Sequence, residues 1–318
     1  MATRIGIDIG GTFTDMVFLT PEGRVARAKV LSTPDDYSLG IAAGLESTLA
    51  TGALSVDDIT QIVHGTTVAA NAILEGKGAR VALITTTGFR DVLEIRRLRM
   101  PVLYDIRWRK PPTLVPRHMR FEVAERIDDL GDIERPLNEA NAREVIGHVL
   151  AEKADAIAIC LLNAYANGAH EQRLRELVRE QDADIPVTLS SELLPEIREY
   201  ERTSTTVVNA YILPVVRHYL GRLEKQLAGR SIAKPLTIMQ SSGGAMGAAA
   251  AAERPIHIIE SGPAAGVVGA AEIARRLGNL NLLSFDMGGT TAKAALVEDG
   301  QFVRVGALEV GGGINIAG

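Results

Sequence analysis

The sequence is poor in cysteine and in aromatic residues. The first shortage excludes some covalent and metal sites, and the second excludes a core filled mainly by aromatic side chains. Its 318 residues include a single cysteine, Cys160, which can form no internal disulfide and cannot hold an iron–sulfur cluster alone. Because Cys160 lies in the apolar run 156–162, we expect it in the core of a protein from a reducing, cytoplasmic setting. Only 4% of the residues are aromatic, so aliphatic side chains must fill most of that core.

Long apolar runs and an excess of positive charge are also lacking. No apolar run is long enough to cross a bilayer, and no basic stretch precedes an apolar one at the N-terminus, so neither a membrane span nor a signal peptide is expected. The formal net charge of −5 argues against a nucleic-acid-binding protein, which usually presents a basic face. The hydrophobic share of 46% allows a sizeable core, and the length favours about two domains.

Strand-like and helix-like runs alternate along the chain, and this alternation predicts an α/β fold. The strands are expected at residues 5–9, 59–64, 81–85, 157–162, 187–190, 236–240, 256–259 and 282–286. The helices are expected at residues 39–50, 67–75, 139–152, 171–181, 205–227 and 264–277.

The segment 100–120 differs from the rest because it contains four prolines, which predict a loop. Nine Lys or Arg residues and three acids lie between Arg90 and Arg120. This charge pattern is typical of a solvated or partner-contact surface, and the alternative is a site for an anionic substrate.

The two ends of the chain carry matching motifs, Ile-Asp-Ile-Gly-Gly-Thr from Ile7 and Phe-Asp-Met-Gly-Gly-Thr from Phe285. Each is typical of a strand, a glycine turn and a second strand. The glycines let backbone N–H groups approach an anion, and the threonine adds a hydroxyl donor. Two such hairpins that face each other can hold a polyphosphate, with their aspartates holding Mg²⁺ through waters. The alternative is two ordinary turns, but a matched pair favours phosphate binding.

This pair resembles the phosphate motifs of the actin, sugar-kinase and heat-shock-chaperone ATPase superfamily. Residues 260–271 resemble that superfamily's first connecting helix, although the chaperones carry a glutamate where Gly262 stands and Glu260 lies two residues upstream. The resemblance implies an actin-like, ribonuclease H-like fold of two lobes. Residues 1–187 would form the first lobe with an inserted α/β region. Residues 188–318 would supply connecting helices and the start of an incomplete second lobe, without a full adenine pocket.

Longer motifs narrow the resemblance to one family. They lie at residues 8–15, 64–75, 78–94, 190–192, 195–206 and 239–244. They are similar to the A subunit of N-methylhydantoinase, the 5-oxoprolinases and the acetone and acetophenone carboxylase subunits. The resemblance implies an oligomeric, ATP-dependent hydrolase that phosphorylates a cyclic-amide carbonyl before ring opening, with a hydantoinase B-type partner subunit. It implies ATP and Mg²⁺ as cofactors and neither nucleic acid nor membrane as a partner.

The resemblance also implies site residues. Asp8 and Asp286 would hold Mg²⁺ and act as the catalytic residues. The phosphate contacts would come from Gly10, Gly11, Thr12, Thr14, Gly288, Gly289, Thr290, Thr291 and Lys293. For Lys293 a surface salt bridge is an equal alternative.

Further substrate candidates have plainer alternatives. His64, at the end of a strand, could bind substrate or take a proton as a neutral imidazole, or it could be a structural histidine. Thr66 and Thr67 could bind substrate at a helix start or simply cap that helix. The turn at residues 241–244 could face a ligand or be a plain loop.

Three other functions remain as alternatives at this point. The carboxylase relatives activate a ketone as its enol phosphate. A sugar-type kinase shares the phosphate motifs, but the long motifs after His64 and Pro195 argue against it. A non-enzymatic nucleotide switch is the third, although dehydratase activators need cluster cysteines and chaperones need a peptide-binding domain that is absent from this sequence.

Overall fold

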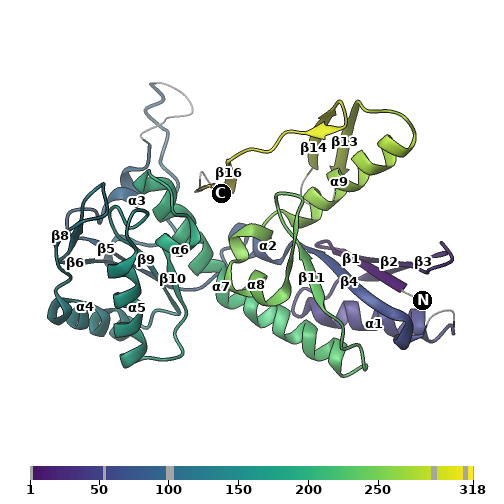
Figure 1. Ribbon diagram of the computed structural model, residues 1–318, viewed down its shortest axis with the longest axis horizontal. Coiled ribbons are helices and arrows are strands. Elements are labelled where there is room, and N and C mark those ends of the chain that lie inside the picture. Colours follow the sequence, from purple (N-terminus) through teal and green to yellow (C-terminus); the bar gives the residue numbers. More distant parts are fainter. Residues whose placement is uncertain (1–2, 53–54, 98–103, 288–291, 311–313, 318) are drawn as a thin grey trace. The chain divides into compact units, whose positions relative to one another are not determined.

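The computed structural model describes residues 3–52, 55–97, 104–287, 292–310 and 314–317 (Figure 1). The chain divides into two compact units, which we call unit 1 (residues 1–72 and 215–305) and unit 2 (residues 73–214 and 306–318). Strands and helices alternate in both units, so the predicted α/β class is confirmed. The division into lobes between residues 187 and 188 stays a prediction.

A six-stranded sheet forms the centre of unit 1, in the order β12-β11-β4-β1-β2-β3. The strands are β1 (Thr3–Ile9), β2 (Phe13–Leu19), β3 (Val25–Leu31), β4 (Ile59–Thr66), β11 (Leu236–Met239) and β12 (Ala245–Gly247). Strand β4 runs parallel to β1 and β11, whereas β1, β2 and β3 form an antiparallel meander. Alternate side chains of β1 are buried, because successive side chains of a strand point to opposite faces.

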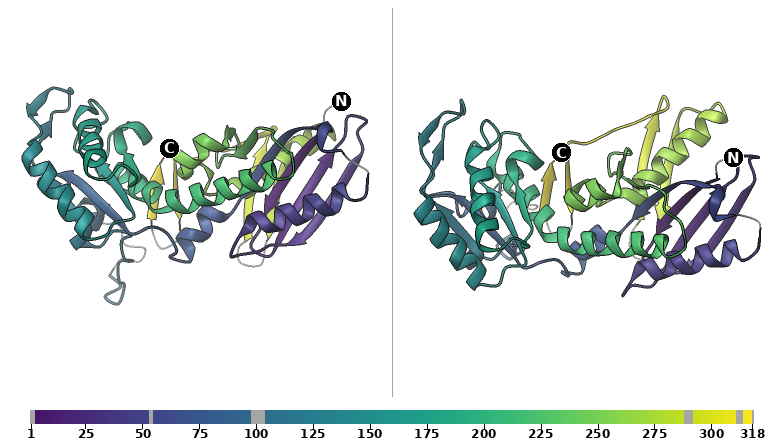
Figure 2. Two further views of the ribbon diagram at one scale, coloured as in Figure 1. Left: turned by 90° about the horizontal axis from the view of Figure 1, so that it is seen from below. Right: turned by 60° about the horizontal axis from the view of Figure 1, so that its bottom comes forward.

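Helix α1 (Tyr37–Leu49) packs against β2 and β3 of this meander (Figure 2). The helix begins where the Asp36 side chain accepts a hydrogen bond from the backbone N–H of Ser38. A Cβ atom at Gly44 would lie 1.8 Å from the terminal methyl carbon of Met16 on β2. Glycine at this position therefore allows the helix to approach the sheet closely.

The remaining elements of unit 1 include a second, three-stranded antiparallel sheet. Its strands are β13 (Leu282–Met287), β14 (Ala292–Glu298) and β15 (Gln301–Phe302). The helices are η1 (Val56–Asp58), α8 (Ala248–Glu253), η3 (Pro255–Ile258), α9 (Ser261–Arg276) and the second half of α7 (Glu199–Ala228). Helix α9 packs against β13 and β14 and also against β4 and β11.

The strand expected at residues 256–259 is wrong, since η3 occupies residues Pro255–Ile258. Pro255 stands at the first position of this 3-10 helix. Its ring fixes φ near the helical value and it has no N–H to give to a ladder of strand hydrogen bonds. Helix α7 also differs from expectation, because it begins at Glu199 and not at residue 205.

Unit 2 is built on a parallel sheet with the order β10-β9-β5-β6. The strands are β5 (Val81–Thr86), β6 (Arg120–Val123), β9 (Ala156–Cys160) and β10 (Val187–Leu189). The two central strands, β5 and β9, are buried along their whole length, as parallel strands covered on both faces usually are. Cys160 ends β9 and is buried, as predicted.

The other elements of unit 2 surround this sheet. The helices are the end of α2 (Val68–Leu74), α3 (Val92–Ile95), η2 (Arg117–Met119), α4 (Glu139–Ala151), α5 (Ala169–Gln181), α6 (Ser190–Leu193) and the first half of α7. Two hairpins pair β7 (Arg126–Ile127) with β8 (Ile133–Arg135) and β16 (Ala307–Val310) with β17 (Ile314–Ala317). Within the described chain, no helix combines the length and the apolar character that a membrane span requires.

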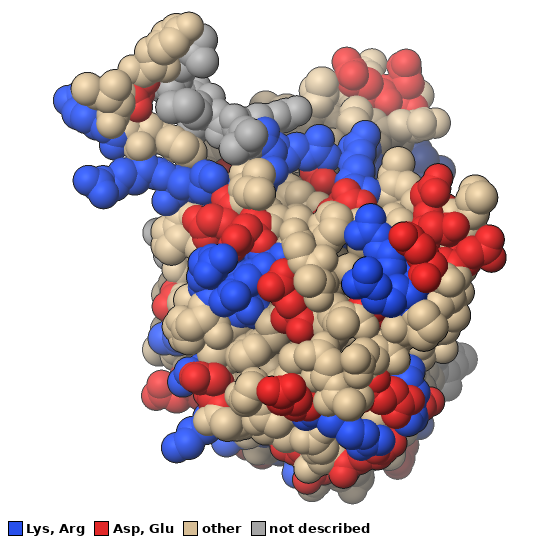
Figure 3. Space-filling view, turned by 90° about the vertical axis from the view of Figure 1, so that its left-hand side faces the viewer, with Lys and Arg blue, Asp and Glu red and all other residues tan. Residues whose placement is uncertain are grey.

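The predicted proline-rich loop is confirmed for residues 104–116, which contain no helix or strand. Three of its side chains are strongly exposed: Tyr104 at 86%, Ile106 at 97% and that of Arg107 at 93%. Figure 3 shows Lys and Arg side chains gathered at the upper left of one face, whereas both signs of charge are mixed over the rest of that face. The loop therefore presents apolar and basic side chains to its surroundings.

Candidate functional site

The two matched motifs fold into hairpins that share one register, both within unit 1. In the first hairpin Asp8 lies opposite Asp15, and in the second Asp286 lies opposite Lys293. One offset of 278 residues (286 − 8 and 293 − 15) relates the two pairings, and the next pair toward each turn follows it too. The internal repeat of the sequence is therefore also a repeat of backbone geometry.

The turn of the first hairpin leaves its tip accessible. The backbone N–H of Gly10 donates to the carbonyl oxygen of Phe13 at 2.9 Å and closes the turn. A Cβ atom at Gly10 would lie 3.2 Å from that same oxygen, which is a tight contact. Gly11 and Thr12 lie at the exposed tip, where their backbone can approach an anion.

A serine directly after β3 supports this turn, and the sequence motif gave no sign of it. The Ser32 hydroxyl donates to the carbonyl oxygen of Gly10 at 2.8 Å and lies 3.0 Å from the hydroxyl of Thr14. Thr14 is fully buried. These contacts favour a role for Thr14 in holding the turn, and its contact with phosphate stays a prediction.

The acidic residues of the two hairpins lie within electrostatic reach of each other. The pKa of Asp8 is raised to about 6, first by partial burial, then by the negative charge of Asp286 and then by that of Asp15. Part of Asp8 remains accessible, so the desolvation comes from protein crowded around its carboxylate and not from complete enclosure. Two acids from opposite ends of the chain thus interact electrostatically within unit 1.

Two glycines keep space open beside the Asp8 carboxylate. A Cβ atom at Gly65, near the end of β4, would lie 3.1 Å from Oδ1 of Asp8. A Cβ atom at Gly262, in the first turn of α9, would also lie 3.1 Å from that oxygen. Larger residues at either position would crowd the carboxylate, so the two glycines preserve its accessible side. Neither glycine belongs to the repeated motif.

The N-terminus of α9 is fastened to the end of β4 by one buried serine. The Ser261 hydroxyl accepts a hydrogen bond from the Thr66 N–H at 3.0 Å and donates to the Thr66 carbonyl oxygen at 2.9 Å. The Thr66 hydroxyl accepts from the N–H of Val68, and the Thr67 hydroxyl donates to the carbonyl oxygen of Ile9. Because α2 begins at Val68, these contacts favour the capping interpretation; a substrate role for Thr66 and Thr67 stays a prediction.

His64 is fully buried, and both of its ring nitrogens have partners. Nδ1 lies 3.3 Å from the carbonyl oxygen of Ile7, and Nε2 lies 2.6 Å from the hydroxyl of Tyr219. Burial lowers the pKa of His64 to about 4, so the ring is neutral at pH 7. A carbonyl can only accept, so Nδ1 carries the proton and Nε2 accepts from Tyr219. This geometry favours a structural histidine, and a substrate role stays a prediction.

Lys293 forms an ion pair with Glu260, the residue that precedes α9. The contact matches the salt-bridge alternative, and a contact between Lys293 and phosphate stays a prediction. Gly288, Gly289, Thr290 and Thr291, the predicted phosphate contacts of the second hairpin, lie outside the described residues. The turn at residues 241–244 joins β11 to β12, and the Ser241 hydroxyl accepts a hydrogen bond from the N–H of Glu260 at 3.1 Å.

The sequence was compared with those of known protein families. Residues 4–182 match the sequence model of the hydantoinase/oxoprolinase N-terminal region, and residues 202–316 match that of hydantoinase/oxoprolinase. The chain belongs to the hydantoinase/oxoprolinase family. The predicted family is thereby confirmed.

Two curated relatives of this hydantoinase/oxoprolinase chain illustrate the range of the family. Caprolactamase subunit alpha of Pseudomonas jessenii is 37% identical over 304 residues, which cover 94% of this chain and 44% of the relative. 5-Oxoprolinase 1 of Arabidopsis thaliana is 31% identical, over 98% of this chain and 26% of the relative. The chain thus spans less than half the length of either relative.

Solved structures of the family have the same fold. The nucleotide-free structure of acetone carboxylase, from work on ATP-dependent acetone carboxylation, matches with a TM-score of 0.85 and 32% identity, over 94% of this chain and 44% of that one. The crystal structure of ATP-dependent caprolactamase from Pseudomonas jessenii matches with a TM-score of 0.82 and 35% identity, over 92% and 43% of the two chains. The predicted actin-like α/β fold class is confirmed by these matches.

Proposed function

We propose that this chain is the ATP-binding part of an ATP-dependent hydrolase of the hydantoinase and 5-oxoprolinase type. The observation that carries the proposal is the pair of hairpins with one register, whose acids Asp8 and Asp286 lie in electrostatic reach. The relatives support it, because caprolactamase and 5-oxoprolinase are named for cyclic amides. A B-type subunit is the proposed partner, since relatives of this chain are named as subunits.

The residues at this point fit a magnesium ion. Burial and then the negative charge of Asp286 raise the pKa of Asp8, and a divalent cation held by these two carboxylates would offset their repulsion. Within the described ranges no group of three or more His, Cys, Asp or Glu side chains is arranged to hold a metal. A site with two carboxylates suits Mg²⁺, which keeps several waters and takes further oxygens from substrate phosphates. When bound, the ion would neutralise charge on the transferring phosphoryl group.

The proposed reaction begins at the carbonyl oxygen of a cyclic amide. An amide carbonyl is a poor electrophile because its nitrogen donates electrons into it. Attack of the carbonyl oxygen on the γ-phosphorus of ATP forms an O–P bond, breaks the bond to the β-phosphate oxygen and releases ADP. Water then adds to the activated carbon, the C–N bond of the ring breaks as the nitrogen takes a proton, and a second water hydrolyses the resulting acyl phosphate to a carboxylate and free phosphate. In such phosphoryl transfers the protein mainly positions the reactants and neutralises charge.

The chain's own groups have distinct parts in this scheme. The exposed turn at Gly11 and Thr12 would give backbone N–H groups and a hydroxyl to the phosphates. Asp8 and Asp286 would hold the magnesium, while Gly65 and Gly262 keep the space beside Asp8 free. The Ser261 hydroxyl would maintain the distance between β4 and α9, since it is bonded to both backbone groups of Thr66.

The test is ATP hydrolysis by the full-length protein with its B-type subunit, in the presence of hydantoin, 5-oxoproline, caprolactam, acetone or glucose. We expect stimulation by at least one cyclic amide. Asp8→Asn and Asp286→Asn should each lower the stimulated rate by about a hundredfold or more, as losses of groups that stabilise the transition state do. Asp58 is an exposed aspartate in η1, so the matched control Asp58→Asn should change the stimulated rate little. Stimulation by glucose alone, or by none of these compounds, would rule out the proposed reaction.

Acetone carboxylase provides the second candidate, because its structure matches this chain with a TM-score of 0.85. In that case the same phosphoryl transfer would go to the enol oxygen of a ketone. The acetone arm of the assay separates the two reactions: stimulation by acetone and not by the cyclic amides would favour the carboxylase type.

A further inference from the structure

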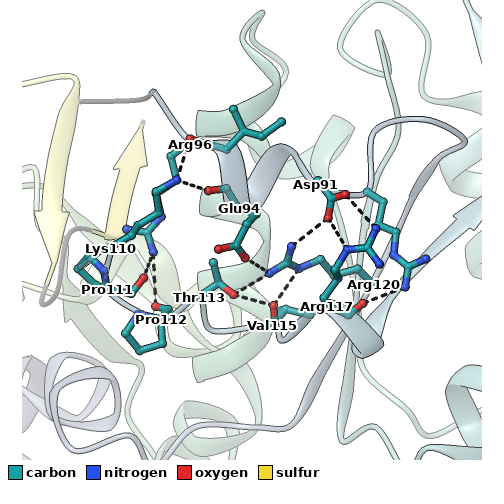
Figure 4. A network of polar contacts seen from close by, with 12 residues as sticks. Asp91, Glu94, Arg96, Lys110, Pro111, Pro112, Thr113, Val115, Arg117 and Arg120 are labelled. Carbon is teal, nitrogen blue, oxygen red and sulfur yellow. Dashed lines mark hydrogen bonds and ion pairs between the residues drawn. The ribbon is translucent and has the colours of Figure 1, made fainter. Parts of the chain in front are cut away.

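Two groups of strongly exposed apolar side chains stand out in the described part of the chain. One is the loop of unit 2 that carries Tyr104 and Ile106. The base of this loop is held by Arg120, which donates to Glu94 and to the Thr113 hydroxyl at 2.8 Å each (Figure 4). This loop has no counterpart elsewhere in the chain that would show what covers it. The second group lies on the hairpin β13–β14 of unit 1, and there the internal repeat provides such a counterpart.

One face of the hairpin β13–β14 is bare. Its side chains belong to alternate residues of the two strands, and all six are exposed: Leu283, Phe285, Met287, Ala292, Ala294 and Leu296. The four larger ones are 54–71% exposed. The opposite face is covered by α9, since Lys293 there contacts Glu260 just before this helix and Val297 is fully buried. A large contiguous apolar patch on a protein surface usually marks an interaction site.

The matching face of the first hairpin is completely buried. The offset of 278 residues (283 − 5 and 296 − 18) relates the two faces, because Ile5 pairs with Phe18 and Leu283 pairs with Leu296. The six matching side chains are at most 3% exposed: Ile5, Ile7, Ile9, Thr14, Met16 and Phe18. The two hairpins thus share their backbone register and an apolar face, but only the first hairpin has this face covered.

Helix α1 covers the β2 side of the first hairpin. Gly44 of this helix lies so close to β2 that a Cβ atom there would be 1.8 Å from the terminal methyl carbon of Met16. A Cβ atom at Gly40 would lie 3.7 Å from the Thr14 hydroxyl oxygen. The second hairpin carries Ala294 where the first carries Met16, so it leaves more room above the strand. A helix that covers Ala294 can therefore hold a bulky side chain at the position where α1 has Gly44.

The free edge of β13 points to a partner of the same kind. Strand β1 lies between β2 and β4, whereas β13 has only β14 beside it among the described strands. An open strand edge presents unpaired backbone N–H and C=O groups that another segment can bind. In the described residues the second hairpin therefore lacks both the neighbouring strand and the covering helix that the first hairpin has.

We propose that the bare face of β13–β14 is the docking site of an amphipathic α-helix, laid across the strands as α1 lies on the first hairpin. The helix would come from the part of the family's polypeptide that this chain does not span, since the chain covers only 44% of caprolactamase subunit alpha. Its apolar stripe would contact Phe285 and Leu296, and a large aliphatic residue would stand over Ala294. The inference does not depend on the proposed reaction.

Cysteine labelling tests this docking, because Cys160 is buried and Phe285→Cys adds one exposed thiol to the 318-residue chain. We expect Phe285→Cys to react rapidly with a maleimide in the 318-residue chain, and about tenfold or more slower in the full-length protein. Leu296→Cys probes the same face and should behave likewise. The matched control is Val17→Cys, at a 44% exposed position on the other face of the first hairpin, which should react equally in both proteins.

A second pair of variants tests the size of the covering side chain. Ala294→Met supplies the side chain that Met16 has in the first hairpin. It should leave the thermal midpoint of the 318-residue chain unchanged, because the added atoms would lie in solvent. It should lower that of the full-length protein by about 3 °C or more, because the added atoms would overpack the space beneath the helix. Ala249→Met, at an exposed position of α8, should change neither midpoint.

Equal labelling of Phe285→Cys and of Leu296→Cys in the 318-residue chain and the full-length protein would overturn the proposal. Protection that appears in the 318-residue chain alone and rises with its concentration would assign the face to a second copy, and would overturn it too. Protection in the full-length protein without any effect of Ala294→Met would overturn the inference about side-chain size.

Discussion

Acid should destabilise the chain through His64 before most other groups respond. His64 is fully buried and neutral, with a pKa of about 4 in the folded state against 6.5 for an ordinary histidine. The unfolded chain therefore binds a proton at this position below about pH 6.5, whereas the folded chain does so only near pH 4. Stability is lost as the pH falls through this window. The full shift corresponds to about 3 kcal/mol, of which about 2 kcal/mol should be lost between pH 7 and pH 5.

The assay is urea unfolding at pH 7 and at pH 5, followed by far-ultraviolet circular dichroism. His64→Gln removes the titrating group while its side-chain amide can still bond the hydroxyl of Tyr219, so this variant should lose about 2 kcal/mol less than wild type over the pH change. The exposed His218 provides a matched control, and His218→Gln should behave like wild type. An equal loss for wild type and His64→Gln would refute the reasoning, because the pH dependence would then belong to other groups.

Two more predictions concern the acid at the first hairpin. The pKa of Asp8 is raised to about 6, so its carboxyl group is protonated below that pH and cannot hold a cation. The affinity for magnesium-ATP, measured by calorimetry, should therefore rise as the pH goes from 5 to 7. A flat pH profile would contradict this prediction. Gly262→Ala would bring a Cβ atom to 3.1 Å from Oδ1 of Asp8 and should weaken magnesium-ATP binding about tenfold by displacing the carboxylate. The control is Gly266→Ala in the same helix, where an added Cβ atom would have nothing within 4 Å, and this variant should bind magnesium-ATP like wild type. Equal affinities for the two variants would show that the space beside Asp8 does not matter for binding.

Much of the fold followed from local sequence signals. The hairpins at Asp8 and Asp286 were predicted because a strand, a glycine turn and a second strand need only residues that are close in the sequence. The strand predicted at residues 256–259 was wrong because this prediction also used local signals alone. The apolar residues of this segment fit a short strand as well as a buried helical turn. Periodicity cannot separate the two over four residues, and only Pro255 at its start favoured the helix.

The candidate site was predictable only where its residues repeat. Asp8 and Asp286 stood out because the same motif occurs twice, but Ser32, Ser261 and Gly65 belong to no motif that names their role. Ser261 reaches Thr66 across 195 positions of sequence, and Gly65 matters because of where the Asp8 carboxylate lies. Such contacts arise from tertiary packing, so a single sequence carries no local signal for them.

The two hairpins are alike in backbone and different in charge, and that difference bears on how they work. Asp15, opposite Asp8, pairs with Lys29 of the neighbouring strand, but both side chains are more than half exposed and such pairs contribute little. Asp15 therefore still adds to the negative potential at Asp8 and helps to raise its pKa.

At the matching position of the second hairpin stands Lys293, which is paired with Glu260. The repeat thus keeps the geometry that brings two acids together, and it places a like charge across from one acid and an opposite charge across from the other. Because a cation is attracted most where negative charge is least compensated, Asp8 is the acid whose protonation should respond most to magnesium.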